Sequence, residues 1–364
     1  MLQVFFKGIY FFLGVAEEMG ESLGRSVGYQ IRLESVIPSG RNGSSILFCT
    51  TGIVLQWMIK NPEIRHVTHL IVDEIHERDV QSDFILALLK DLLRIRQDLK
   101  VVLMSATLNA NSFSKYFSGC PILNIPGMTF PVKEFYLEDV LEMTGYNLAN
   151  DLPPMRARPE KIWHQHTRRG KNEAHQKDEY AEMIGPFLRD LRSRNQYSRS
   201  TLNALEHPKC EDMNHKLIAA LIFQLHCEKP YDGAILCFLP GWEDISKVNT
   251  LLTDKKSNFC LGHDAKVLPL HSLIPTGAQR EIFDRPPSNV RKIVLSTNIA
   301  ETSVTIDDIV YVIDSGKVKI TNFDVKANVA TFKPEWISLA NAKQRKGRAG
   351  REYIVNFSDF FYCK

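Results

Sequence analysis

The chain has 364 residues, of which 44% are hydrophobic and 24% are charged, a balance that is usual for a globular protein. A chain of this length accommodates about two domains. The formal net charge is only +3, which excludes a generally basic surface, so any surface that binds nucleic acid has to be local.

The seven cysteines are scattered without a Cys-x-x-Cys pair, which excludes a disulfide framework or a zinc site and indicates a reducing intracellular compartment. A short apolar run at residues 8–16 resembles the core of a signal peptide. Glu17 and Glu18 follow it in place of a cleavage site, and the run is too short to span a bilayer. We therefore expect no membrane association and a location in the cytoplasm, the nucleus or both.

The first part of the chain alternates between strand and helix patterns. Apolar periodicity predicts helices over residues 15–23, 53–60 and 84–95. Short apolar runs predict buried strands over residues 46–49, 69–72 and 101–104. Strands that alternate with helices in this way predict a parallel sheet with crossover helices.

The strand over residues 69–72 runs directly into Asp73 and Glu74. The carboxyl end of a buried parallel strand opens into a ligand crevice. Two carboxylates there can hold a hydrated Mg²⁺ and accept a proton from an attacking water. An isolated acid pair is more often a solvated turn after a core strand, so this assignment depends on the rest of the sequence.

Residues 138–212 have a weaker pattern, with a polar run at 163–171 and an arginine-rich run at 188–199. Charged stretches are usually solvated, so we interpret this segment as a charged connector or helical insert in preference to a dedicated binding surface. It is also the natural boundary between two domains.

The α/β pattern returns after this segment. A helix is predicted over residues 217–225, and strands are predicted over residues 234–239, 266–270, 292–296 and 309–313. Two alternating runs within residues 317–333 predict a β-hairpin. Residues 344–351 (QRKGRAGR) combine arginines, which are bidentate donors, with glycines that let a backbone approach phosphate closely. Because this run follows ordered structure, we favour a folded site over a flexible tail.

Five segments together resemble the motifs of the DEAH-box RNA helicases of superfamily 2, and they occur in that family's order. They are residues 69–78 (HLIVDEIHER), 105–107 (SAT), 238–242 (FLPGW), 296–308 (STNIAETSVTIDD) and 344–351. Residues 28–32 (GYQIR) and 49–57 (CTTGIVLQW) are similar to the RNA helicase A-like subgroup, and in particular to its G-quadruplex-resolving members. One such segment alone would be weak evidence for the family, whereas five segments in the family's order are specific to it.

The resemblance implies an α/β fold of two tandem RecA-like domains with parallel sheets, with the β-hairpin in the second. We expect the first domain over residues 15–137, the connector over 138–212 and the second domain over 213–364. Residues 1–14 form a divergent N-terminus in this interpretation.

The resemblance also implies that the chain binds ATP and Mg²⁺. In the first domain, Asp73 and Glu74 would hold the Mg²⁺ water shell, with Glu74 polarising the attacking water. His76 would link this site to the second domain, and Ser105 and Thr107 would couple hydrolysis to domain movement.

In the second domain, Gln344, Arg348 and Arg351 would reach the γ-phosphate. Such arginines typically contribute about 10³–10⁵ in rate. Asp307 would approach the ribose, and Phe283 would stack on the adenine.

Three residues, Arg32, Thr51 and Thr297, would touch the sugar-phosphate backbone of single-stranded RNA. Contacts of this kind position a strand without reading its sequence. The expected partner is therefore RNA, with structured or G-quadruplex RNA and DNA as further candidates.

The sequence departs from the family at both ends. It contains no G-x-x-x-x-G-K-[ST] phosphate loop, Gly14 stands where an adenine-stacking arginine is expected, and the sequence after Arg351 also diverges. The further domains that complete the family's RNA channel are not recognisable. We therefore expect a chain truncated at both ends, with an incomplete first domain whose sheet lacks the strand before the phosphate loop and exposes an edge.

The expected function is ATP-driven 3′-to-5′ translocation on RNA with unwinding of duplexes or G-quadruplexes. Two interpretations stay open for this chain: a fragment or splice form of an active helicase, or a hydrolysis-dead RNA-binding module that competes with the full-length enzyme. In either case we expect no ATP hydrolysis by this chain alone, because no amide cradle and lysine neutralise the β-phosphate.

Overall fold

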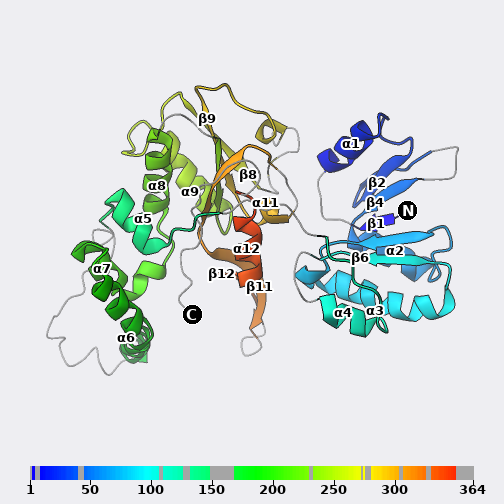
Figure 1. Cartoon of the computed structure of the whole chain (residues 1–364), viewed down its shortest axis with the longest axis horizontal. Coiled ribbons are helices and arrows are strands. Elements are labelled where there is room, and N and C mark those ends of the chain that lie inside the picture. The colour runs from blue at the N-terminus through cyan, green and yellow to red at the C-terminus, as the bar shows by residue number, and fades with distance from the viewer. Residues whose placement is uncertain are drawn as a thin grey trace. The chain divides into compact units, whose positions relative to one another are not determined.

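A computed structural model of the chain describes residues 2–4, 9–39, 45–105, 110–125, 132–147, 168–228, 233–271, 274, 280–302, 306–324 and 329–349. The chain divides into two compact units, Met1–Gly127 and Met128–Lys364 (Figure 1). Each unit has its own largely or wholly parallel sheet.

The described residues of the first unit form a six-stranded sheet in the order β3-β2-β4-β1-β5-β6. The strands are β1 (Leu2–Val4), β2 (Val27–Ile31), β3 (Glu34–Val36), β4 (Ile46–Cys49), β5 (His69–Val72) and β6 (Lys100–Leu103). All neighbouring strands are parallel except β2 and β3, which form an antiparallel pair at one edge. This arrangement confirms the predicted α/β class.

β1 lies between β4 and β5 and pairs with both of them. Leu2 is opposite Leu47 on one side and Leu70 on the other. The expectation that a strand is missing from this sheet is therefore wrong, because residues 2–4 of the divergent N-terminus form a strand between β4 and β5. α1 (Ile9–Glu18) follows and ends before Gly20, whose φ of 67° is left-handed, so this helix begins and ends earlier than the one predicted over residues 15–23.

The described part of the first unit also contains the helices α2 (Thr51–Lys60), α3 (Val80–Ile95) and α4 (Ala110–Tyr116). α3 begins at the N-cap residue Asp79, whose carboxylate accepts hydrogen bonds from the backbone of Gln81 and Ser82. The buried faces of α2 and α3 pack in one apolar cluster with Leu70 and Val72 of β5. β5 is therefore a rigid base for the residues that follow it.

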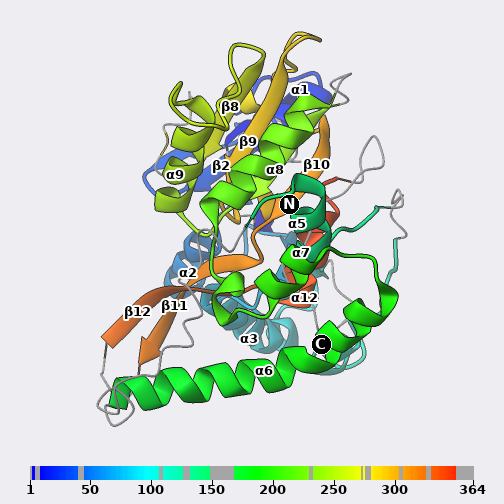
Figure 2. The ribbon, with the colours of Figure 1, turned by 90° about the vertical axis from the view of Figure 1, so that its left-hand side faces the viewer.

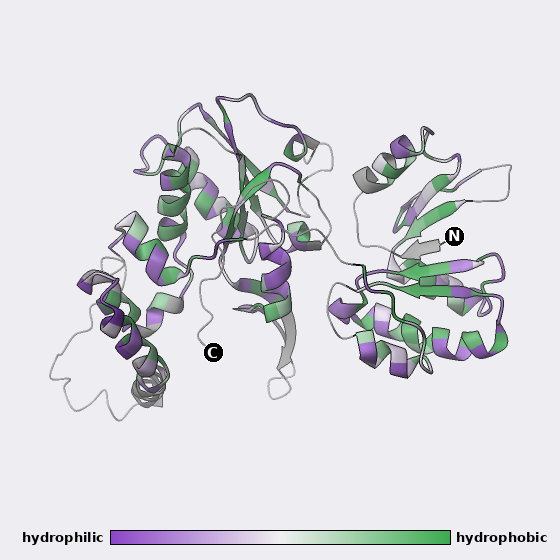
Figure 3. Cartoon of the chain, in the orientation of Figure 1, coloured by the Kyte–Doolittle hydropathy of each residue, from purple (hydrophilic) through white to green (hydrophobic). Residues whose placement is uncertain are grey.

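The described residues of the second unit form a four-stranded parallel sheet in the order β10-β7-β9-β8. The strands are β7 (Ala234–Phe238), β8 (Ala265–Leu270), β9 (Arg291–Ser296) and β10 (Ile309–Asp314). Every residue of β7, β9 and β10 is buried, as expected of strands covered on both faces. Figure 3 shows the apolar character of β4 and β5 in the first sheet and of the central strands β7 and β9 in the second.

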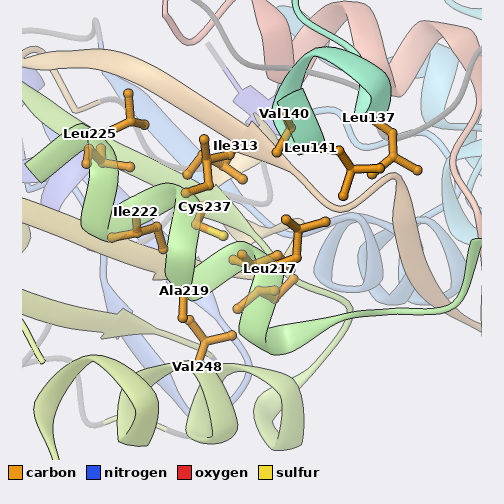
Figure 4. Packing of buried hydrophobic residues seen from close by; sticks show 14 of the residues in the cluster. Leu137, Val140, Leu141, Leu217, Ala219, Ile222, Leu225, Cys237, Val248 and Ile313 are labelled. Atoms are coloured by element: carbon orange, nitrogen blue, oxygen red, sulfur yellow. The ribbon is translucent and has the colours of Figure 1, made fainter. Parts of the chain in front are cut away.

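The described residues of the second unit include the helices α5 (Leu137–Thr144), α6 (Arg168–Arg194), α7 (Arg199–Leu205), α8 (His215–Cys227), α9 (Trp242–Thr253), α11 (Ile299–Thr302) and α12 (Leu339–Lys346). α6 is a single long helix (Figure 2). Leu137 and Leu141 of α5 share an apolar cluster with Leu217 of α8 and Ile313 of β10 (Figure 4). Part of the predicted connector therefore belongs to the core of the second unit.

The predicted β-hairpin is confirmed, with β11 (Lys317–Asp324) antiparallel to β12 (Val329–Trp336). Its register pairs Lys317 with Trp336 and Lys319 with Pro334. Among the residues that the structure describes, no helix combines the length and apolar character needed to cross a membrane.

Candidate functional site

The acid pair lies at the carboxyl end of β5, in the first unit. The backbone of Met104 donates to the Val72 carbonyl at 2.8 Å, and Ile75 donates to the Met104 carbonyl at 3.1 Å, so the segment around the pair is held to the end of β6. Oδ1 of Asp73 accepts a hydrogen bond of 2.9 Å from the backbone of Glu74. Both acidic residues are partly exposed, so their carboxylates can be reached by a hydrated ion.

Glu74 has an uncommon backbone conformation, with φ 54° and ψ 33° in the left-handed region. Arg78 has a similar conformation, with φ 53°, at the other end of the short 3-10 helix η1 (Ile75–Glu77). Such a conformation costs a residue with a Cβ about 1–2 kcal/mol. Backbone strain of this kind concentrates at functional sites, which agrees with a functional role for this turn.

His76 joins the acid pair. Its Nδ1 lies 3.5 Å from Oε2 of Glu74, and its side chain is only 7% exposed. A pocket of about 430 Å³ lies beside it and is lined by His76, Arg78, Asp83, Leu86, Ser112, Phe113 and Tyr116. The structure thus brings Asp73, Glu74 and His76 together in one turn after β5.

A bidentate ion pair borders this pocket. Arg78 donates to the two carboxylate oxygens of Asp83 at 2.8 and 2.9 Å. The hydrogen bond from Arg78 lowers the pKa of Asp83 below its usual range. Asp83 is therefore ionised at neutral pH and directs the guanidinium of Arg78 along the start of α3.

The carboxylates of Asp73 and Glu74 suit Mg²⁺ better than a metal ion whose ligands all come from the protein. No group of three or more His, Cys, Asp or Glu side chains among the described residues is arranged to hold a metal ion. Mg²⁺ is commonly held by only one or two carboxylates and keeps several of its waters. Asp73 and Glu74 meet that requirement.

Three other predicted residues belong to the first unit within its described part. Arg32 is exposed in the turn between β2 and β3, and Ser105 is exposed directly after β6. Thr51 is only 5% exposed, and its hydroxyl donates to Oε1 of Gln81 at 2.8 Å. Its side chain is therefore bound to α3, and the predicted contact with RNA remains a prediction. Thr107 lies outside the described residues.

A buried ionic cluster lies between α12, α11 and the end of β10 in the second unit. Nε of Arg345 donates to Oε2 of Glu301 at 2.8 Å, and Nη1 donates to Oδ1 of Asp314 at 2.8 Å. The guanidinium carbon lies 4.9 Å from the ring centre of Phe238. Asn341 Nδ2 also donates to Glu301. These contacts fix α12 against β10 and α11.

Gln344 and Arg348 flank this buried arginine along the chain. Gln344 is partly exposed near the end of α12, and Arg348 Nη2 donates to the backbone carbonyl of Glu301. Gln344 and Arg348, the two residues predicted to contact phosphate, are thus positioned by the same helix and ionic cluster as Arg345. Arg351 lies outside the described residues.

The remaining predicted residues of the second unit lie close to its sheet. Thr297 directly follows β9 and is 8% exposed, and its carbonyl accepts a 2.9 Å hydrogen bond from the Ser296 hydroxyl. Asp307 is exposed just before β10. Phe283 is 42% exposed and follows the 3-10 helix η5 (Arg280–Ile282).

Sequence reasoning did not single out Arg345, Glu301 or Asp314. One signal was available, because Ala342, Arg345 and Ala349 follow one another at intervals of three and four residues. Ala342 and Arg345 lie on one buried face of α12, and Ala349, just beyond the end of the helix, is buried as well.

Two family models match the chain. Residues 14–115 match the DEAD/DEAH box helicase model, and residues 215–352 match the helicase conserved C-terminal domain. The first match contains the acid pair, and the second contains the arginine-rich segment that follows the hairpin.

Similar proteins come from animals, plants and bacteria. The chain is 50% identical over 343 residues to the bovine ATP-dependent DNA/RNA helicase DHX36, a match that covers 93% of this chain and 33% of that protein. It is 47% identical over 342 residues to the DExH-box ATP-dependent RNA helicase DExH1 of Arabidopsis thaliana, with coverages of 93% and 33%. The crystal structure of the E. coli DExH-box NTPase HrpB matches with a TM-score of 0.61 and 26% identity, covering 98% of this chain and 35% of that one. The chain therefore spans about a third of the length of these proteins.

Proposed function

The chain belongs to the DEAD/DEAH box helicases, and on that premise we propose that it forms the two RecA-like domains of an ATP-dependent RNA helicase. The observation that carries the proposal is the acid pair Asp73 and Glu74, held in a strained turn at the carboxyl end of a buried parallel strand. This is where open α/β sheets bind their ligands. RNA, and also DNA, are the nucleic-acid partners that the relatives' names support, and G-quadruplexes are the structured substrate that we propose.

Asp73 and Glu74 would hold Mg²⁺, which when bound would neutralise charge on the phosphates of ATP. Glu74 would also orient a water through its carboxylate. In the second unit, Arg348 and Gln344 would bind the terminal phosphate, while Asp307 and Phe283 would bind the ribose and the base. Ser105 would couple the nucleotide to domain movement.

A specific feature favours a second candidate function for this chain, an RNA-binding module that does not hydrolyse ATP. No phosphate loop of the form G-x-x-x-x-G-K-[ST] occurs in the sequence, so no lysine of that motif meets the β-phosphate. RNA binding requires only backbone contacts such as those proposed for Arg32 and Thr297.

Whether the chain itself hydrolyses ATP is tested by measuring RNA-stimulated ATP hydrolysis of the 364-residue chain against its Glu74→Gln variant. We expect equal, background rates. A clearly faster reaction of the unsubstituted chain would establish hydrolysis and reject the hydrolysis-dead module.

RNA binding itself is tested by fluorescence anisotropy with labelled single-stranded RNA over a series of salt concentrations. Arg32→Ala should weaken binding and reduce the slope of log Kd against log salt by about one unit. Arg25→Ala removes the same charge from another exposed position of the first unit and should have less effect. Binding that is absent, or that responds equally to both substitutions, would contradict the proposed path of the RNA.

A further inference from the structure

Two exposed residues proposed for nucleoside binding, Phe283 and Asp307, are on separate loops of the second unit. Phe283 follows η5, and Asp307 precedes β10. Their neighbours Ile282 and Ile306 are 1% and 6% exposed and pack in the same apolar cluster. The two loops are therefore anchored in the same apolar cluster, whereas the side chains of Phe283 and Asp307 are exposed.

One buried cation connects the two loops. Lys292, in β9, is 1% exposed, and its Nζ donates to the carbonyls of Ile282 at 2.7 Å and Asp284 at 3.1 Å. The same Nζ lies 2.8 Å from Oδ1 of Asp308. The two carbonyls flank Phe283 in sequence, and Asp308 is adjacent to Asp307.

These contacts match the chemistry of the ammonium group completely. A lysine ammonium has three N–H donors and no acceptor. Its three partners come from the loop that carries Phe283 and the loop that carries Asp307. β9 lies between β7 and β8, so the lysine extends from an interior strand of the sheet. Both loops are thus tied to one rigid point.

We propose that Lys292 is a positioning residue for nucleoside recognition, holding the ring of Phe283 and the carboxylate of Asp307 at a fixed separation. The inference rests on the proposed nucleotide-binding function and adds a residue that touches no ligand. A base and a ribose are joined by one short glycosidic bond, so they can engage both loops only if the spacing of the loops lies within a narrow range. Preorganising that spacing lowers the entropy lost on binding.

The neighbouring residue Arg291 provides a matched control. It is also 1% exposed and carries the same charge on the same strand. Its guanidinium donates to the carbonyls of Leu225 at 2.8 Å and Glu228 at 3.1 Å, which belong to the end of α8 and the residue after it. Losing Arg291 therefore removes a buried cation without releasing either nucleoside loop.

The experiment measures Kd for ADP and for inorganic pyrophosphate by ligand-observed NMR, at a temperature where every variant is folded by circular dichroism. The variants are Lys292→Met, Asp308→Asn, Arg291→Met, Phe283→Ala and Asp307→Ala. Asp308→Asn removes the ion pair and keeps the lysine, so the test survives if Lys292→Met does not fold. Because pyrophosphate lacks the base and the ribose, its affinity reports only on the residues that bind the phosphates.

We expect Lys292→Met and Asp308→Asn to weaken ADP binding by about tenfold, since that factor corresponds to the loss of one good contact. Pyrophosphate binding should be unchanged in Asp308→Asn and should change in Lys292→Met no more than in Arg291→Met. Arg291→Met should retain the ADP affinity although it lowers Tm.

Two outcomes would overturn the inference and are distinguishable. If Phe283→Ala and Asp307→Ala weaken ADP binding while Lys292→Met and Asp308→Asn behave like Arg291→Met, the nucleoside site stands and the positioning role of Lys292 fails. If Phe283→Ala and Asp307→Ala also leave ADP binding unchanged, the proposed nucleoside site fails, and the role of Lys292 fails with it.

Discussion

Arg345 and Asp314 form an ion pair with a distance of 2.8 Å between Nη1 and Oδ1, and their side chains are only 1% and 0% exposed. Glu301, whose side chain is 4% exposed, accepts from the same guanidinium. Burial alone would lower the pKa of Arg345, but the two carboxylates raise it above its ordinary value, so the arginine remains charged. The cluster joins α12, α11 and the end of β10 at one point.

Arg345→Met should lower the free energy of unfolding of the second unit by about 3–5 kcal/mol, because it leaves two buried carboxylates without their cation. Urea unfolding followed by circular dichroism measures this change. Arg194→Met is the control, because Arg194 pairs with Asp190 four residues away on the surface of α6 and both side chains are at least half exposed. That pair contributes at most about 0.5 kcal/mol. Similar small losses in both variants would contradict the prediction.

Gly28→Ala should destabilise the first unit by about 1–3 kcal/mol, the usual range for a side chain forced into a packed site. A Cβ at this position of β2 would lie 2.3 Å from the Val36 carbonyl oxygen and 2.6 Å from Cδ of Pro38. Thermal unfolding measures the loss. Gly14→Ala in α1 is the opposite case, because nothing lies within 4 Å of its added Cβ and alanine favours a helix by about 1 kcal/mol. If Gly28→Ala left Tm unchanged, β2 and β3 would not approach as closely as described.

The parts of the fold that could be predicted are those whose pattern is local. The strand before Asp73 and the buried strands β7, β9 and β10 each contain a short apolar run, and α3 has a clear apolar face. Asp73, Glu74 and His76 are neighbours in the chain, so their proximity follows from one turn. Adjacent residues need no tertiary information to meet.

The parts that could not be predicted depend on distant partners. β1 has only three residues, and it forms a strand because β4 and β5 both offer hydrogen bonds there. Lys292 and Arg291 look like the polar start of a strand, but the acceptors of Arg291 and two of the three partners of Lys292 are backbone groups, as far as 66 and 10 residues away. A backbone acceptor leaves no trace in residue type, so the burial of these cations becomes visible only in the structure.

Lys319→Met should raise the pKa of His271 toward its ordinary value of 6.5. Burial is the main reason that this pKa is lowered, and the positive charge of Lys319 lowers it further. NMR titration of the imidazole measures the change. Lys333→Met is the control, because Lys333 is exposed on the same hairpin and pairs in register with Ile320. A pKa that stays the same in Lys319→Met would contradict the assigned role of its charge.

The same histidine predicts a pH dependence of stability. Because its folded pKa lies below 6.5, the unfolded state binds more protons as the pH falls through that value, so the folded state loses stability. His271→Gln should reduce the loss of unfolding free energy between about pH 7 and pH 5.5. Urea unfolding at both pH values measures it, and an unchanged pH dependence would show that His271 does not contribute.

Phe332→Ala should weaken the binding of single-stranded RNA, if RNA follows the aromatic face of the hairpin. Phe332, Pro334 and Trp336 alternate along β12 and lie opposite residues of β11 that include Lys317 and Lys319. The ammonium of Lys317 lies 3.1 Å from the ring centre of Trp336, and Phe332 is 64% exposed. Aromatic rings beside lysines bind bases by stacking and phosphates by charge, and one stacked base is worth about 1–3 kcal/mol.

Fluorescence anisotropy with labelled RNA measures this effect, and a loss of about fivefold or more in affinity is expected from the lower end of that range. Ile320→Ala is the control, because Ile320 is 41% exposed on the other face of the same hairpin. It removes a similar apolar surface while leaving the aromatic face intact, so its affinity should stay close to that of the unsubstituted chain. Equal losses in the two variants would mean that the hairpin contributes through its general shape and not through stacking on Phe332.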